Sequence, residues 1–259
     1  MTAFSYSRKL SRMLTLAHVG AWRGAIHSSE VWLFTFVLAI AFPVADYLLY
    51  FRLKSKLKLY AWNICAEWAL VAACVWVIHS KGFRLADLGE RLGSPTRTLV
   101  VSGLLIAIFA ALTLASKKQT RKASVAQLSK AVGRAKRILP LNGTDRAVFV
   151  AVALTAGVCE EFLYRGWLLN LIGYALGSVW AGLVLSSIVF GAAHAYQGRS
   201  AIIGASVLGI VFGAVFILSG SLLPGQILHA AIDLKNELAL GKIASRLDMK
   251  PAGTPSLSS

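Results

Sequence analysis

The chain alternates between long apolar stretches and short basic ones. Three uninterrupted apolar runs lie in its first half, at about residues 31–51, 60–78 and 98–115, and each carries at most one acidic residue. A helix needs roughly 18 or more apolar residues to cross about 30 Å of hydrocarbon. A membrane-spanning segment must also satisfy its own backbone hydrogen bonds, which favours helices. The pattern therefore predicts transmembrane helices.

Over the whole chain, the pattern predicts an all-α fold: a polytopic transmembrane helix bundle with about seven spans, within a range of six to eight. The fourth span is unusual because it begins as a plain apolar helix and carries Glu160, Glu161 and Arg165 in its second half. A soluble α-bundle with long buried helices is the alternative. The expected spans are about 31–51, 60–78, 98–115, 147–171, 175–194, 201–218 and 222–240.

Charge, proline and glycine between the apolar runs divide the chain into five segments. We expect an amphipathic N-terminal segment (1–30), N-terminal transmembrane helices (31–115), a basic amphipathic cytoplasmic connection (116–146), a transmembrane domain with the candidate chemistry (147–240) and a polar tail (241–259). The connection at 116–146 indicates an interfacial helix on an anionic leaflet, with a solvated basic loop as the alternative. Its apolar residues recur at spacings of three and four: Val125, Leu128, Val132, Ala135 and Leu139.

Composition and charge agree with a membrane protein. Hydrophobic residues make up 57% of the chain and charged residues 15%, whereas about 25% of the residues in soluble domains are charged. In a soluble protein, the net charge of +16 would suggest nucleic acid as a partner. Here the basic residues lie between the apolar runs, where they attract anionic lipid headgroups. We therefore expect lipid headgroups as a partner and no nucleic acid.

The basic residues also predict an orientation. With seven spans and the N-terminus outside, 17 basic residues fall on the inner side of the membrane and 8 on the outer side. Loops rich in lysine and arginine stay in the cytoplasm. The connection at 116–146, with nine basic residues, is therefore expected there.

Several ionisable residues lie inside the predicted spans, where each needs a physical reason. Asp46 and Glu67 are single acids, for which a polar neighbour or a place near an interface is sufficient. The second half of the chain differs, because three of its four spans each carry a pair at i, i+4 spacing. On a helix, both members of such a pair lie on one face. The pairs are Glu161–Arg165, Phe190–His194 and His229–Asp233.

Together these residues suit the hydrolysis of an amide. That reaction needs a base to activate water, donors for the developing oxyanion and a group that holds the base in place. The same residues would also suit a divalent metal such as zinc, with Glu160, His194 and His229 as ligands. The sequence lacks the HExxH spacing of common zinc proteases and the GxSxG nucleophile elbow. The metal-dependent and metal-free readings both stay open.

Three motifs, CEEFLYRGWL at 159–168, FGAAH at 190–194 and HAAID at 229–233, resemble those of the CAAX prenyl endopeptidase and bacteriocin-processing family of intramembrane proteases. That family carries EExxxR, FxxxH and HxxxN or HxxxD, in this order, on separate membrane helices. The resemblance covers about residues 145–240. It implies an intramembrane endopeptidase that cleaves a membrane-associated protein or peptide. Asp233 is typical of many prokaryotic members, so we expect an integral protein of a prokaryotic cell membrane.

The resemblance also implies a role for each motif residue. The six residues form three pairs with different roles. Glu160 and His194 would activate the water, His229 and Asp233 would line the oxyanion side, and Glu161 and Arg165 would support this arrangement. Since an ionised aspartate repels an oxyanion, Asp233 must be protonated, orient His229 or bind a metal. The same polar cluster could instead serve an ion-coupled transporter or a non-catalytic immunity or scaffold protein.

Overall fold

The structure, a computed structural model, describes residues 19–122 and 137–248, and all regular elements in these two ranges are helical. The all-α prediction is confirmed. The elements are α2 (Val19–Ala25), α3 (Ser29–Phe36), η1 (Val37–Ala41), α4 (Phe42–Arg52), α5 (Lys56–Ser80), η2 (Leu85–Leu88), α6 (Pro95–Lys122), α8 (Gly143–Glu160), η3 (Glu161–Leu169), α9 (Asn170–Ala175), α10 (Val179–Ala193), η4 (Ala195–Gln197), α11 (Arg199–Ser219) and α12 (Leu223–Asp248).

The helices have the lengths of a polytopic membrane protein, as the apolar runs predicted. Each predicted span falls largely on one helix or on one continuous helical segment. The fifth span was predicted to begin at residue 175, but α10 begins at Val179, after Ser178, whose hydroxyl accepts from the Ala181 amide. Gly177 has a φ of +62° and ends the preceding helix. Four helical segments are long and apolar enough to span a bilayer: Ser29–Arg52, Lys56–Ser80, Gly143–Ala175 and Arg199–Ser219; Pro95–Ala111 and Val179–Ala193 are shorter apolar helices.

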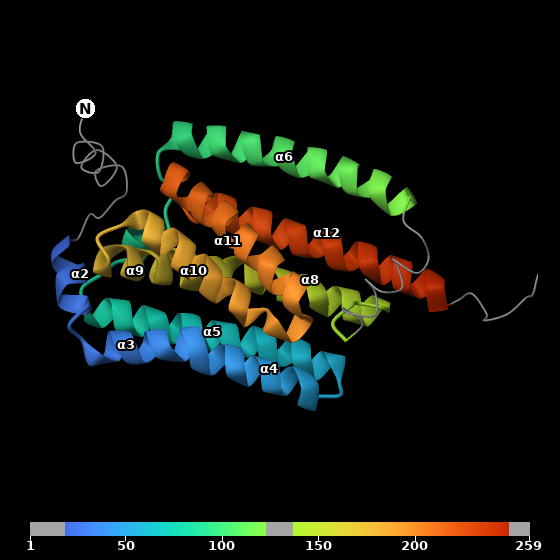
Figure 1. The fold of residues 1–259 in the computed structure, drawn as a ribbon, viewed down its shortest axis with the longest axis horizontal. Helices are drawn as coiled ribbons and strands as arrows, with labels where there is room; N and C mark the ends of the chain where they lie inside the picture. Colours follow the sequence, from blue (N-terminus) through green and yellow to red (C-terminus); the bar gives the residue numbers. More distant parts are fainter. Residues whose placement is uncertain (1–18, 123–136, 249–259) are drawn as a thin grey trace, which may run out of the picture.

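The long helices run side by side along one direction (Figure 1). The segment Gly143–Ala175 is the central one, because 56% of its apolar stretch is buried, against 17% for Ser29–Arg52. Helix α8 packs between α5 and α12, α10 packs on α11, and α6 lies at the edge of the bundle, on α11 and α12. The outward faces carry large apolar side chains, as a lipid environment requires. Examples are Trp32, Leu33, Trp76, Leu99, Ile106, Ile203 and Ile227.

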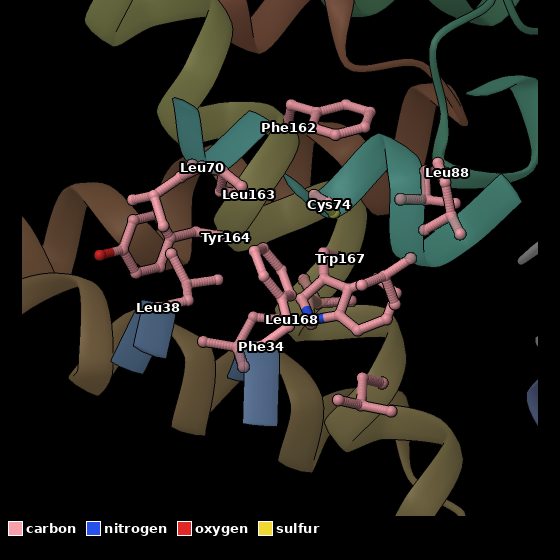
Figure 2. Close-up of a cluster of buried hydrophobic side chains, with 14 of the residues drawn as sticks. Phe34, Leu38, Leu70, Cys74, Leu88, Phe162, Leu163, Tyr164, Trp167 and Leu168 are labelled. Carbon is pink, nitrogen blue, oxygen red and sulfur yellow. The ribbon is translucent and has the colours of Figure 1, made fainter. Parts of the chain in front are cut away.

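The apolar core surrounds η3, whose nine residues are all buried. Figure 2 shows side chains from α3, η1, α5, η2 and η3 meeting around Trp167. The Trp167 ring contacts Phe34 edge-on at 5.5 Å between centroids, and its Nε1 donates to the Thr35 hydroxyl at 3.3 Å. Because this core fixes η3 on several sides, the polar residues that η3 carries are held rigidly.

The structure describes only parts of the predicted N-terminal segment and of the predicted basic connection. In the expected N-terminal segment, Trp22 of α2 packs into the core, 4.7 Å from Phe83 between ring centroids. Residues 1–18, most of the amphipathic pattern at 123–136 and the tail from 249 lie outside the described residues. Where the connection is described again, Arg137 donates to the Leu53 carbonyl at 2.7 Å. The basic connection therefore ends against the α4–α5 turn.

Candidate active site

The two adjacent glutamates lie where α8 changes into a π-helix. Asn142 caps α8 by accepting from the Asp145 amide, and the helix runs to Glu160 before η3 begins at Glu161. The sequence predicted an ordinary helix here, whereas the observed turns are wider. Such π-turns are frequent at functional sites because they redirect side chains. The wider turns are compatible with an ion pair of 3.0 Å between Arg165 Nη1 and Glu161 Oε1.

Glu161 and Arg165 lie fully buried beneath the site, each with 1% of its side chain exposed. The same Oε1 of Glu161 lies 2.9 Å from Nδ1 of His229 on α12. One carboxylate oxygen therefore faces both a guanidinium and an imidazole. With Nδ1–H donating to Glu161, the ring orientation of His229 is fixed from behind.

The second ring nitrogen of His229 faces two more carboxylates. Its Nε2 lies 3.5 Å from Glu160 Oε2 and 3.6 Å from Asp233 Oδ2. Asp233 is thus on the Nε2 side of the ring, and Glu161, not Asp233, contacts Nδ1. Asp233 can therefore orient His229 only from the Nε2 side, and its protonated, orienting and metal-binding options all stay predictions.

His194 ends α10 rather than lying within it. It is the C-cap residue of that helix, and its Nδ1 lies 2.9 Å from the Phe190 carbonyl oxygen one turn earlier. Side chains of this kind often satisfy the last carbonyls of a helix. When Nδ1–H donates to that carbonyl, Nε2 keeps its lone pair and can accept a proton.

Two phenylalanines hold the charged residues in place. The Arg165 guanidinium lies over the Phe190 ring at 4.2 Å and over the Phe212 ring at 5.3 Å. Phe190 also contacts His194 edge-on at 4.8 Å, and Phe212 stacks on His229 at 4.9 Å. Such contacts favour a cation beside the ring face. The sequence indicated Phe190 by its motif, but an aromatic residue in the apolar run of α11 gave no signal for Phe212.

A cavity of about 280 Å³ brings four of the candidate residues together: Glu160, His194, His229 and Asp233 all line it. Glu161 and Arg165 do not line this cavity and lie behind His229. The first half of the chain contributes as well, through Asp46, Tyr50 and Asn63 of α4 and α5. Their place at the cavity was not predicted, because a single polar residue in a span is compatible with simple pairing.

The comparisons with known proteins bear on the same part of the chain. Residues 142–234 match the Rce1-like family. The description of that family model is type II CAAX prenyl endopeptidase Rce1-like. The resemblance inferred from the three motifs is therefore confirmed, and at the level of the family the match supports a membrane peptidase. No curated protein and no solved structure matches the chain.

The donor atoms of the Rce1-like segment do not fit a metal ion as they are placed. Within 19–122 and 137–248, no three side chains of His, Cys, Asp or Glu converge in an arrangement that could hold one. His229 directs Nδ1 to Glu161 and His194 directs Nδ1 to the Phe190 carbonyl, so only the Nε2 atom of each ring is left as a possible metal donor. We therefore derive the chemistry from the carboxylates and imidazoles alone.

Proposed function

We propose that the chain is an intramembrane endopeptidase that hydrolyses a peptide bond with water activated by Glu160 and His194. The observation that supports this proposal is that both side chains line one cavity in the helix bundle, together with His229 and Asp233. The Rce1-like match favours a peptidase over a transporter or a scaffold protein.

Glu160 is the base in the proposed reaction. A water molecule between its carboxylate and the free Nε2 of His194 is held by both groups, and its oxygen attacks the carbonyl carbon of the substrate. The proton of that water passes to Glu160, which then gives it to the nitrogen of the leaving amine as the C–N bond breaks. A positioned base of this kind contributes about 10²–10⁴-fold to the rate.

His229 is the donor to the developing oxyanion. In the imidazolium form, Nδ1–H donates to Glu161 and the second proton, on Nε2, points toward Glu160 and Asp233 at the cavity. Glu161 and Arg165 hold this orientation without touching the substrate. A preorganised donor of this kind stabilises the oxyanion most strongly where water is excluded.

The substrate that we propose is a membrane-associated protein or peptide. The cavity is near the lower end of the range for ligand pockets, about 300–1,000 Å³, and it is large enough for a short extended stretch of chain. Apolar side chains such as Leu59, Val152 and Leu208 line it beside the polar groups. Basic residues at the end of the bundle near Lys56 would bind anionic lipid headgroups, and this would hold that end of the protein at the membrane surface where the substrate is anchored.

Substitution of the two proposed water-activating residues tests this function. We expect Glu160→Gln and His194→Gln each to lower kcat by about 10²–10⁴-fold, because each removes a group that holds or deprotonates the water. The measurement is cleavage of membrane-anchored reporter peptides by the purified protein in lipid, with the products identified by mass spectrometry. Ser186→Ala is the matched control, since the Ser186 hydroxyl bonds only to the Leu183 carbonyl of its own helix. Full activity in either variant would contradict the mechanism.

A further inference from the structure

A second, smaller cavity adjoins the large one at Glu160. Its volume is about 20 Å³, and five residues line both this cavity and the larger one: Asp46, Asn63, Glu160, His194 and Tyr196. Glu67 of α5 and Tyr164 of η3 line the small cavity but not the large one. The catalytic carboxyl therefore borders both the space for the substrate and the smaller cavity.

Three side chains around the small cavity have a buried polar atom without a hydrogen bond to any described residue. These atoms are Oε2 of Glu67, Oε2 of Glu160 and the hydroxyl of Tyr164. The Glu67 and Tyr164 side chains belong to residues that are only 1% and 3% exposed. An unsatisfied buried polar group costs about 1–3 kcal/mol. Three such atoms around one cavity therefore need a shared partner.

The Tyr164 hydroxyl is directed out of the apolar core. Figure 2 shows the Tyr164 ring beside Leu38 and Leu70, with its oxygen pointing away from the cluster. On its other side the ring contacts Phe190 edge-on, at 5.1 Å between centroids. Packing on these sides fixes the ring, so the hydroxyl has a defined direction.

The size and the polar groups of the small cavity match those of a buried water site. A cavity needs about 10–15 Å³ to hold one water, and such a water needs two to four polar partners. We propose that one ordered water occupies this cavity and bonds to Glu67, Tyr164 and Oε2 of Glu160, the oxygen that also lies 3.5 Å from His229 Nε2. Glu67 and Tyr164 are then positioning residues of the catalytic carboxyl.

The hydrogen bonds of this water balance. The Tyr164 hydroxyl donates to the water oxygen, and the two water protons go to Glu67 and Glu160. Asn63, one turn before Glu67, also lines the small cavity. Since Glu67 lies outside residues 142–234, a helix beyond the Rce1-like segment would complete the site. The catalytic consequence rests on the proposed peptidase function, while the water site does not.

Three variants test the positioning role. Tyr164→Phe and Glu67→Ala remove one partner of the water, and we expect each to lower kcat about tenfold with KM unchanged, because one net hydrogen bond is lost and the substrate contacts stay. Glu67→Gln keeps groups that bond to water and should stay within about twofold of the parent. The Ser186→Ala variant again serves as the control for a buried hydroxyl away from the cavity.

Two measurements keep this inference separate from the proposed function. If the parent protein cleaves substrate and both Tyr164→Phe and Glu67→Ala retain its kcat, or if Glu67→Gln is as impaired as Glu67→Ala, the positioning role is wrong. A high-resolution experimental structure tests the water itself, whether or not the parent is active. Density for one water within hydrogen-bonding distance of Glu67 and Tyr164 is expected, and its absence would overturn the inference. An inactive parent would instead contradict the peptidase function.

Discussion

At the scale of single residues, the site depends on one oxygen atom of Glu161. That atom faces both Arg165 and His229, at 3.0 and 2.9 Å, in a place where 1% of the Glu161 side chain is exposed. Neither terminal nitrogen of Arg165 makes a hydrogen bond to another described residue, so the charge of Glu161 and the rings of Phe190 and Phe212 are what stabilise the guanidinium. A buried ion pair of this kind is costly to break on one side only.

We therefore expect Glu161→Gln to unfold more easily than the parent. The substitution keeps the shape of the side chain but leaves the Arg165 charge buried without its counter-charge, which should lower the free energy of unfolding by about 3–5 kcal/mol. Denaturant titration in detergent micelles, followed by tryptophan fluorescence, measures it. Glu30→Gln is the control, because the Glu30–Lys81 ion pair is half exposed and surface pairs contribute little. An equal effect in both variants would show that burial of the pair is unimportant.

The sequence predicted which residues would meet at this site but not how they pair. Glu161, Arg165 and His229 stood out because charged groups in an apolar span need a reason. The sharing of one carboxylate oxygen depends on the relative rotation of η3 and α12, which no spacing in the sequence specifies. Phe212 lay in an apolar run, where an aromatic side chain is ordinary, so its stacking on His229 could not be foreseen.

At the scale of elements, close packing of α8 on α12 sets the position of His229. A Cβ atom on Gly157 would lie 2.7 Å from the Gln226 carbonyl oxygen and 2.9 Å from the Ala230 Cβ. The two backbones therefore touch directly, four residues before Glu161 and within one residue of His229. Small residues permit such contact between membrane helices. The small residues in these spans predicted close approach in general, but not which glycine faces which helix.

Gly157→Ala should separate these two helices. The added methyl group meets backbone atoms of α12, which cannot move like the end of a side chain, so His229 must shift relative to Glu160. A displacement of about 1 Å in an active site can lower the rate about 10²-fold. We expect a loss of that order in kcat, with a destabilisation of about 1–3 kcal/mol from overpacking.

The matched variant for this test is Gly103→Ala in α6. A Cβ atom there meets nothing within 4 Å, and alanine is favoured over glycine inside a helix by about 0.5–1 kcal/mol. Peptide cleavage and denaturant titration on both variants distinguish a packing effect from a general intolerance of substitution. Parental activity in Gly157→Ala would show that the α8–α12 distance does not position the site.

At the scale of the whole molecule, the helices place the basic connections at one end of the bundle. The α4–α5 turn, the end of α6 and the start of α8 lie together there, while η2 and the α9–α10 turn lie at the other end (Figure 1). Lys56 joins this basic end by bonding to Asp145 at 2.7 Å. The alternation of spans and the charge count predicted such an arrangement, because both follow from simple periodicity and from the positions of lysine and arginine.

The orientation in the membrane follows from this asymmetry. Because connections rich in lysine and arginine remain on the cytoplasmic side, the exposed α4–α5 turn at Lys54 should face the cytoplasm, and the exposed Leu92, between η2 and α6, should face outward. In a Cys65→Ala background, which removes the cysteine exposed on α5, we expect Leu92→Cys to react with a membrane-impermeant thiol reagent in intact cells. Lys54→Cys should react only after the cells are opened.

Labelling of Lys54→Cys from outside, with Leu92→Cys protected, would show that the orientation is the opposite of the expected one. The Cys65→Ala chain without an added cysteine controls for Cys74 and Cys159, which are both buried. The outcome also bears on the proposed substrate, since the large cavity is lined by Tyr50 and Ile138, near the end that carries Lys54. A cytoplasmic Lys54 therefore requires that the peptide reach Glu160 from the cytoplasmic leaflet, and an external Lys54 would require the opposite route.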